Sequence, residues 1–274
     1  MRLPVALAFA AILSFGAFAP AIADDTPAQA SDVPWIKDQS LTNDAVNAVR
    51  NGGILALEPF VPNLEAALSN AKQTMDAASG PGGKVVFTDG PADSLLALMD
   101  ASTAGKSAQA VPNPYPIIAL YLGSYYNESG EPNQALRVLD EGLAVTSNVG
   151  AHRPVLYSER GAALEGLHRW QDALDDYNEG LKINGLDPQI HALLLRGRGF
   201  TLTELGQLDD AEAAYNESLK YAPGNERAEH EIQYIDQLRM GGGKAPAGII
   251  PVQPQQTPPA DAAPPTPAPS SATP

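Results

Sequence analysis

The stretch that decides the fold is LRGRGFTLTELGQLDDAEAAYNES, residues 195–218. Its apolar residues recur at steps of three and four, which predicts two helices, and Gly206 separates them. Two earlier stretches align with it without gaps: YSERGAALEGLHRWQDALDDYNEG at 157–180 and ALYLGSYYNESGEPNQALRVLDEG at 119–142. Corresponding residues lie 38 positions apart. We therefore predict three copies of one helical hairpin.

Each copy has the same arrangement of small and large residues. A glycine lies in the first helix, an alanine in the second, and a large residue four positions after the alanine. We expect the small residues to let the helices approach closely and the large residue to fill the space between neighbouring hairpins. The glycines are Gly123, Gly161 and Gly199; the alanines are Ala135, Ala173 and Ala211; the large residues are Leu139, Tyr177 and Tyr215.

This pattern resembles the tetratricopeptide repeat (TPR) family. The resemblance implies a mainly α fold, a TPR-like α-solenoid of helical hairpins with repeats at 116–149, 154–187 and 192–225. The 38-residue step is longer than the family's usual 34, and we expect the extra residues, near 150–153 and 188–191, in longer turns between repeats. An apolar stripe with Ala228, Ile232 and Ile235 predicts a C-terminal capping helix, which completes a repeat region at 111–240.

The resemblance also implies a concave face lined by the first helix of each repeat. We predict that a protein or peptide partner contacts Leu120, Ser124, Asn127, Ser158, Glu165, Arg196, Phe200 and Thr203 there. The remaining positions of this face are Ile117, Val155, Ala162 and Leu193. The Lys/Asn clamp with which some relatives grip a terminal carboxylate is missing.

Arg196 and Phe200 are the strongest candidates on this face, because Arg and aromatic side chains often dominate the energy of an interface. Burial against the capping helix is the alternative for Phe200. For Arg160 and Arg198 we expect an ion pair with an acid of a neighbouring helix.

The N-terminus has the pattern of a cleavable signal peptide, residues 1–23. Met1-Arg2 precedes an apolar stretch over 5–13. Ala21-Ile22-Ala23 is an A-x-A motif, which predicts cleavage after Ala23. The alternative is a membrane anchor, which needs about 20 continuous apolar residues, and Gly16 and Pro20 interrupt this stretch. We therefore expect a periplasmic or secreted bacterial protein that does not insert in a membrane once the signal is cut.

Three other segments lie outside the repeats. We expect residues 24–40 to be loose and 41–110 to form a small mixed or helical region, packed on the first repeat. Within it we predict helices over 42–50, 63–78 and 91–102, a strand over 84–88, and either strand or helix over 54–57. We predict that residues 241–274 form a disordered Pro/Ala-rich tail. Within them, Ala245–Pro274 contains ten of the 25 prolines and only one charged side chain.

Composition and motifs argue against several function classes. There is no cysteine, and the formal charge of −15 opposes nucleic-acid binding, since phosphates require a basic face. Gly105-Lys106-Ser107 lacks the first glycine of a phosphate loop, and the four histidines lack metal-ligand spacing. We predict no catalytic residue, no cofactor and no metal.

These observations favour a non-catalytic interaction scaffold or adaptor in the cell envelope, which binds a peptide or partner helix on the concave face of the repeats. Two alternatives stay open. One is an envelope enzyme or ligand-binding protein with its site in residues 40–110, which a deep pocket with converging polar groups would favour. The other is a structural protein that self-associates as a homo-oligomer.

Overall fold

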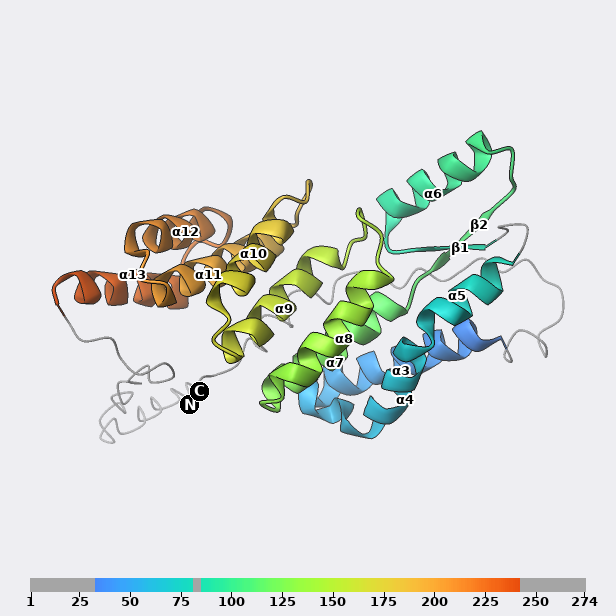
Figure 1. The fold of residues 1–274 in the computed structure, drawn as a ribbon, viewed down its shortest axis with the longest axis horizontal. Helices are drawn as coiled ribbons and strands as arrows, with labels where there is room; N and C mark the ends of the chain where they lie inside the picture. Colours follow the sequence, from blue (N-terminus) through green and yellow to red (C-terminus); the bar gives the residue numbers. More distant parts are fainter. Residues whose placement is uncertain (1–32, 81–84, 242–274) are drawn as a thin grey trace, which may run out of the picture. The chain divides into compact units, whose positions relative to one another are not determined.

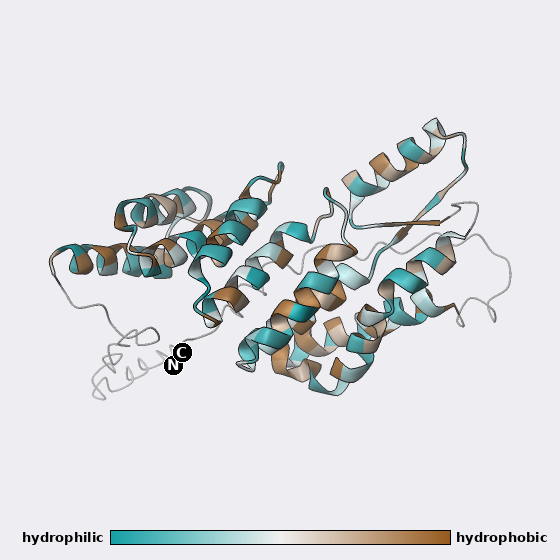
Figure 2. Ribbon diagram, in the orientation of Figure 1, coloured by the Kyte–Doolittle hydropathy of each residue, from teal (hydrophilic) through white to brown (hydrophobic). Residues whose placement is uncertain are grey.

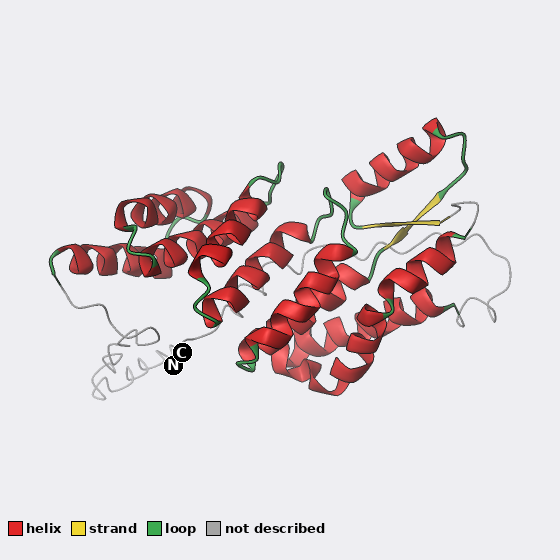
Figure 3. Cartoon of the chain, viewed as in Figure 1, coloured by secondary structure: helices red, strands yellow, loops and turns green. Residues whose placement is uncertain are grey.

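The computed structural model describes residues 33–80 and 85–241, and this part of the chain is mainly helical (Figure 3). The expected signal peptide (1–23), residues 24–32 and the tail beyond Gly241 lie outside the described residues. The repeat region holds α7 (Tyr115–Glu128), α8 (Pro132–Ala144), α9 (Arg153–Gly166), α10 (Trp170–Leu181), α11 (Pro188–Glu204), α12 (Leu208–Tyr221) and α13 (Glu226–Arg239) (Figure 1).

Six of these helices pair as the three hairpins α7/α8, α9/α10 and α11/α12. The turn inside each hairpin needs one residue with positive φ, a conformation that favours glycine. Gly130 (φ 75°) and Gly206 (φ 76°) supply it in the first and third hairpins. His168 (φ 57°) does so in the second, at the aligned position.

The glycine of each first helix is the point where the hairpin closes. A Cβ placed at Gly123 would lie 2.6 Å from the Leu139 side chain, and one at Gly161 would lie 2.8 Å from the Tyr177 ring. At Gly199 the Tyr215 ring is 2.9 Å away. These distances are shorter than carbon atoms tolerate, so only glycine fits. The predicted close approach of the two helices at this glycine is confirmed. The large residue, which we expected between neighbouring hairpins, lies against the glycine of its own hairpin.

The extra residues of the 38-residue step lie in two different kinds of structure. Residues 145–152 do form a long connection between α8 and α9. Residues 188–191, expected in a turn, form instead the first turn of α11, and that part of the prediction is wrong. Asp187 caps this turn, because its Oδ1 accepts a hydrogen bond from the Gln189 amide at 2.8 Å.

Helix α13 follows the third hairpin as the predicted capping helix. Asn225 begins it by accepting a hydrogen bond from the Ala228 amide at 3.0 Å. Ala228 and Ile235 are fully buried in an apolar cluster with Ala211, Ala214 and Tyr215 of α12. α13 therefore covers the apolar face that the last hairpin leaves open.

The region before the repeats is more helical than we expected. Its elements are α3 (Pro34–Gly52), the 3₁₀ helix η2 (Ile54–Phe60), α4 (Val61–Ser69), α5 (Ala71–Ser79) and α6 (Pro91–Thr103). The prediction of a loose segment over 24–40 is wrong for residues 34–40, which form the start of α3. Pro34 suits the first helical position, and the Trp35 ring contacts Phe87 edge-on at 5.7 Å.

Residues 54–57, left open between strand and helix, belong to η2. The single helix expected over 63–78 is divided at Asn70, a turn residue whose Nδ2 donates to the Ala66 carbonyl at 2.8 Å. Leu57, Leu64 and Leu68 are buried in one core with residues of α7. This region is therefore packed on the first repeat, as predicted. Figure 2 shows how apolar α7 is. This helix contacts η2 and α4 of the N-terminal region as well as α8 and α9 of the repeats.

A short β–α–β unit lies between α5 and α7. Strand β1 (Val85–Thr88) pairs in parallel with β2 (Gln109–Pro112), and α6 connects them. The sequence did not predict β2. The Asp89 carboxylate, directly after β1, accepts a hydrogen bond from the His152 amide at 2.9 Å, and it also pairs with the His152 ring. The unit is thereby fixed to the long connection between α8 and α9.

Candidate partner-binding surface

Most of the predicted contact residues are covered by the structure. Residues Leu120, Ser124, Ser158, Glu165 and Thr203 are each 7 % exposed or less. Side chains at that depth offer little surface to a partner. The reason is that α7 packs directly on α9, and α9 on α11, which closes these positions between successive first helices.

A polar seam joins α7 to α9. The Asn127 Nδ2 donates to the Glu159 backbone oxygen at 3.0 Å and to its Oε2 at 3.1 Å. Asn127, a predicted contact residue, is thus used within the fold. Burial raises the pKa of Glu159 to about 7, against the hydrogen bond from Asn127, which lowers it. Sequence reasoning missed Glu159 because an acid within a helical repeat is usually solvated.

We expect Glu159→Gln to stabilise the protein at alkaline pH only. Glu159 has a raised pKa in the folded chain, so its protonated form supports folding below its unfolded pKa near 4.5, and this support is lost as the pH rises through about 7. The shift corresponds to about 3 kcal/mol at pH 8, and loss of a charged hydrogen bond from Asn127 offsets about 1 kcal/mol. Denaturant unfolding should therefore show a gain of about 2 kcal/mol at pH 8 and none at pH 4.

The exposed Glu179→Gln variant is the control for this measurement, since Glu179 forms a solvent-exposed pair with Lys182. Its effect should not vary with pH in the same range. A gain for Glu159→Gln that is equal at pH 4 and pH 8 would contradict the assignment of a buried, protonated carboxyl.

A second seam joins α9 to α11 around Tyr177. The Tyr177 ring lies between two glycines, Gly161 of its own hairpin and Gly197 of the next, where an added Cβ would overlap it. Burial raises its pKa well above the ordinary value, and a hydrogen bond to Glu165 raises it further. Glu165 also accepts from the Thr201 hydroxyl at 2.8 Å. Gly197 was missed because its partner lies in the preceding hairpin.

Three predicted contact residues keep accessible surface: Asn127, Arg196 and Phe200 are half-buried. Three further positions of the face, Ile117, Ala162 and Leu193, are half-buried as well. The Phe200 ring contacts Trp170 of α10 edge-on at 6.2 Å and packs against the apolar cluster that includes Ile235 of α13. The structure therefore supports the alternative for Phe200, burial against the apolar cluster of the capping helix, and leaves part of its side chain accessible. α11 contributes three of the half-buried positions of the face, Leu193, Arg196 and Phe200, and α9 contributes Ala162.

The arginines of the first helices differ in their partners. The Arg160 guanidinium forms two parallel hydrogen bonds with the Asp176 carboxylate, at 2.8 Å and 2.6 Å, and a third with Asp140 at 2.6 Å. The predicted ion pair is confirmed for Arg160. It is wrong for Arg198, whose Nε is buried without a hydrogen-bond partner in the part of the chain that the structure describes.

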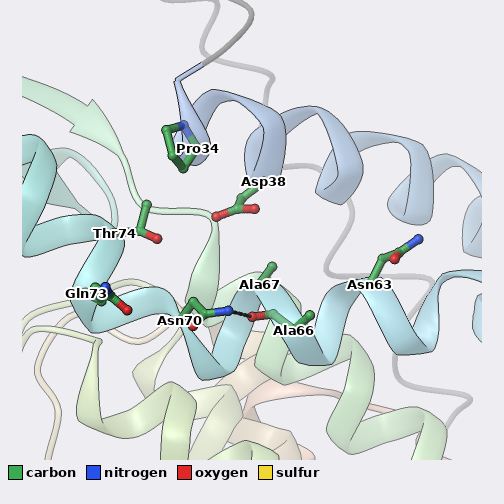
Figure 4. A pocket seen from close by; sticks show the side chains of 8 residues that line it. All are labelled: Pro34, Asp38, Asn63, Ala66, Ala67, Asn70, Gln73 and Thr74. Atoms are coloured by element: carbon green, nitrogen blue, oxygen red, sulfur yellow. Dashed lines mark hydrogen bonds between the residues drawn. The ribbon is translucent and has the colours of Figure 1, made fainter.

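A hollow of about 380 Å³ lies at the junction of α3, α4 and α5, within and beside residues 40–110 (Figure 4). Asp38 and Thr74 stand on either side of it, and the fully buried Tyr115 donates to the Asp38 carboxylate at 2.7 Å. Burial raises the pKa of Asp38, and the Tyr115 bond lowers it. Asn63, Asn70 and Gln73 are exposed, so the polar groups do not converge as a catalytic or ligand site requires.

The rest of the described chain, residues 33–80 and 85–241, has few features that point to chemistry. It contains no group of three or more His, Asp or Glu arranged to hold a metal ion. Its helices are all too short or too polar to cross a bilayer. The exposed face of α6 carries Leu95, Leu96 and Met99, which are 61 %, 46 % and 56 % exposed (Figure 2).

Comparison with known proteins gives structural neighbours only. No protein-family model matches this chain, and no curated protein matches it. The second TPR domain of the human RPAP3 protein, solved in complex with the HSP70 peptide SGPTIEEVD, is 21 % identical over 44 % of this chain and 98 % of its own, with a TM-score of 0.38. Two crystal structures of MamA are 18 % and 17 % identical, cover 69 % and 75 % of this chain and 85 % and 84 % of their own, and have TM-scores of 0.42 and 0.44.

The chain's own geometry supplies the assignment of the fold. Three hairpins follow one another, and each closes at the same glycine against the same large residue of its second helix. Each turn has its positive-φ residue at the aligned position, and a further helix caps the last hairpin. The described residues thus form a mainly α, TPR-like solenoid of helical hairpins.

Proposed function

We propose that this protein is a non-catalytic interaction scaffold of the cell envelope, which binds a peptide or helix of a partner protein. The binding surface is the accessible part of α9 and α11: Ala162, Leu193, Arg196 and Phe200. The observation that carries the proposal is the contrast along these helices. Four positions of the face on α9 and α11 are closed by helix packing, namely Val155, Ser158, Glu165 and Thr203, whereas these four are half-buried and combine apolar surface with one cation.

Physical chemistry supports a peptide as the ligand of such a surface. An aromatic and an arginine one turn apart are the residue types that most often carry binding energy. Part of each side chain is already immobilised: the Phe200 ring contacts Trp170, and Arg196 is half-buried. Less side-chain entropy is therefore lost on binding. Export to the envelope rests on the N-terminal signal pattern.

Ala162→Arg tests the surface. We expect the long side chain to obstruct the face and to reduce the partner recovered by in-cell crosslinking and pull-down at least about tenfold. Ala213→Arg is the matched control, because Ala213 is exposed on α12, in the second helix of its hairpin, and the charge change is the same. Recovery of the same partner in equal amounts from both variants and from the unchanged protein would contradict the proposed surface.

A further inference from the structure

We propose that the Pro-rich end of this chain docks on the chain's own second repeat, against three rings at the turn of the α9/α10 hairpin. The rings belong to His168, Trp170 and Phe200, and together they are called the ring platform below. The docked stretch is PPTPAP, residues 264–269, in which four of six residues are proline. The proposal goes beyond the proposed function, and its test needs no partner protein.

The ring platform links the turn of the second hairpin to the first helix of the third. The centroid of the Trp170 ring lies 5.1 Å from that of His168 and 6.2 Å from that of Phe200, and both contacts are edge-on. His168 is exposed, whereas Trp170 and Phe200 are half-buried. All three residues therefore keep surface that a further chain segment can cover.

The backbone at His168 indicates that its ring is placed there for a purpose. Among residues 33–80 and 85–241 it is the one residue other than glycine with positive φ, at 57°. Such a conformation strains a residue that has a side chain, and strain of this kind is concentrated at functional sites. The aligned residues of the other hairpins are Gly130 and Gly206. The third hairpin also has Leu208 where the second has Trp170, so its turn carries neither ring.

Proline-rich segments are a ligand class that aromatic surfaces of this kind bind. A proline-rich stretch favours the extended polyproline II conformation, so it loses little conformational entropy when it docks on aromatic side chains. Residues 245–274 contain ten prolines and one charged side chain, Asp261. Because the protein carries a charge of −15, it repels acidic ligands, and this nearly uncharged segment avoids that repulsion.

The end of α13 brings the start of this segment close to the platform. Arg239 pairs with Asp209 and Glu212 in the first two turns of α12, each at 2.6 Å, so α13 ends beside the third hairpin, the neighbour of the second. Pro264 follows Arg239 by 25 residues, which span up to about 75 Å as polyproline II, several times the spacing of about 10 Å between packed helices. Tethering also raises the effective concentration of the segment, so a weak contact suffices.

Docking has a consequence for the proposed function, on which this one step rests. Phe200 belongs both to the ring platform and to the proposed partner surface. The docked segment therefore covers part of that surface, and a partner peptide has to displace it. The docking itself is tested without reference to any partner.

Photo-crosslinking within one chain is the test. A benzoyl-phenylalanine replaces Arg169, in the turn that carries the ring platform, and in a second protein it replaces Gln207, the aligned residue of the third hairpin. The two positions are matched, because both are exposed and both precede a second helix with φ −87° and ψ near 65° (62° and 67°). Position 207 lies next to Asp209, which pairs with the end of α13, so proximity alone favours the control.

The full chain is purified, irradiated at low concentration and digested with trypsin. It has no lysine or arginine after Lys244, so residues 245–274 are released as one peptide that mass spectrometry identifies. We expect this peptide to be linked to position 169 at least about fivefold more than to position 207, the effect of one favourable aromatic contact. A mixture of nitrogen-15-labelled and unlabelled chains shows whether each link lies within one chain.

Two variants separate the role of the rings and prolines from proximity. His168→Gly combined with Trp170→Leu gives the second hairpin the residues that the third has at the same turn positions. Pro264→Ser, Pro265→Ser and Pro267→Ser together leave the repeats unchanged. Each variant should reduce the link from position 169 to the level seen at 207. Circular dichroism checks that the repeats are folded.

Equal links from positions 169 and 207, a link that survives either variant, or links only between labelled and unlabelled chains would overturn the proposal. The last result would show that a second copy supplies the segment. None of these outcomes decides the partner surface, which the Ala162→Arg pull-down tests separately.

Discussion

Arg160→Met is expected to lower the free energy of unfolding at pH 7 by about 3–5 kcal/mol, the usual cost of removing one partner of a buried ion pair. The Asp176 side chain is 7 % exposed and receives two hydrogen bonds from Arg160. Burial already raises the pKa of Asp176, and Arg160 is the group that lowers it. Without Arg160 the carboxylate is left buried and unpaired. Denaturant unfolding at pH 7 measures the loss.

The control is Arg169→Met in the same repeat. Arg169 and Asp172 form a pair of the same chemistry, but their side chains are 53 % and 51 % exposed, and such pairs contribute about 0–1 kcal/mol. Arg160→Met combined with Asp176→Leu should recover most of the stability, because the unpaired charge is removed. Equal losses in Arg160→Met and Arg169→Met would show that burial of the Arg160–Asp176 pair does not matter.

Gly197→Val should destabilise the protein by about 3 kcal/mol, a large effect for overpacking. A helical glycine normally gains stability on replacement by a residue with a side chain, since glycine is about 1 kcal/mol worse than alanine in a helix. Here the added Cβ would overlap the Tyr177 ring, which Gly161 confines from the other side. The seam between the second and third hairpins must then open. Thermal unfolding followed by circular dichroism measures the change.

Gly166→Ala is the comparison, because a Cβ there lies 3.4 Å from the nearest atom, Pro132 Cβ, an ordinary contact. It should leave the melting temperature unchanged or raise it. Adding Tyr177→Leu to Gly197→Val should restore part of the loss by freeing space. If Gly197→Val is as stable as the unchanged protein, the close approach of α11 to Tyr177 is not a feature of the folded chain.

The sequence alone identifies only one of the two glycines that confine Tyr177. Gly161 is found because a glycine and a large residue recur at one spacing in every repeat. Gly197 is not found, because it contacts Tyr177 across hairpins and has no glycine counterpart in the other two repeats, where the aligned residues are Tyr121 and Glu159. A contact that occurs between only one pair of hairpins leaves no recurring residue pattern from which it could be predicted.

The candidate surface was predicted less well than the fold for a related reason. The resemblance places positions on a concave face, but it does not say how closely successive first helices pack. In this chain they close over Ser124, Ser158 and Glu165, and they use Asn127 to satisfy Glu159. Exposure depends on packing distances that residue spacing does not encode.

The region before the repeats gave the weakest prediction. Strand β2 has four residues, Gln109–Pro112, and no alternation of apolar and polar side chains, so it becomes a strand only through pairing with β1. Helix α3 begins at Pro34, whose neighbour Trp35 contacts Phe87, far away along the chain. Both elements depend on long-range contacts, which local patterns do not report.

Site-specific photo-crosslinking in cells shows directly whether a partner binds the accessible face of α9 and α11. A benzoyl-phenylalanine is placed in turn at Leu193 on this face, at Ala213 on α12, and at Leu95 on the exposed apolar face of α6. We expect a crosslinked partner from position 193 and none from 213 or 95. A partner that crosslinks from 213 or 95 and not from 193 would contradict this expectation.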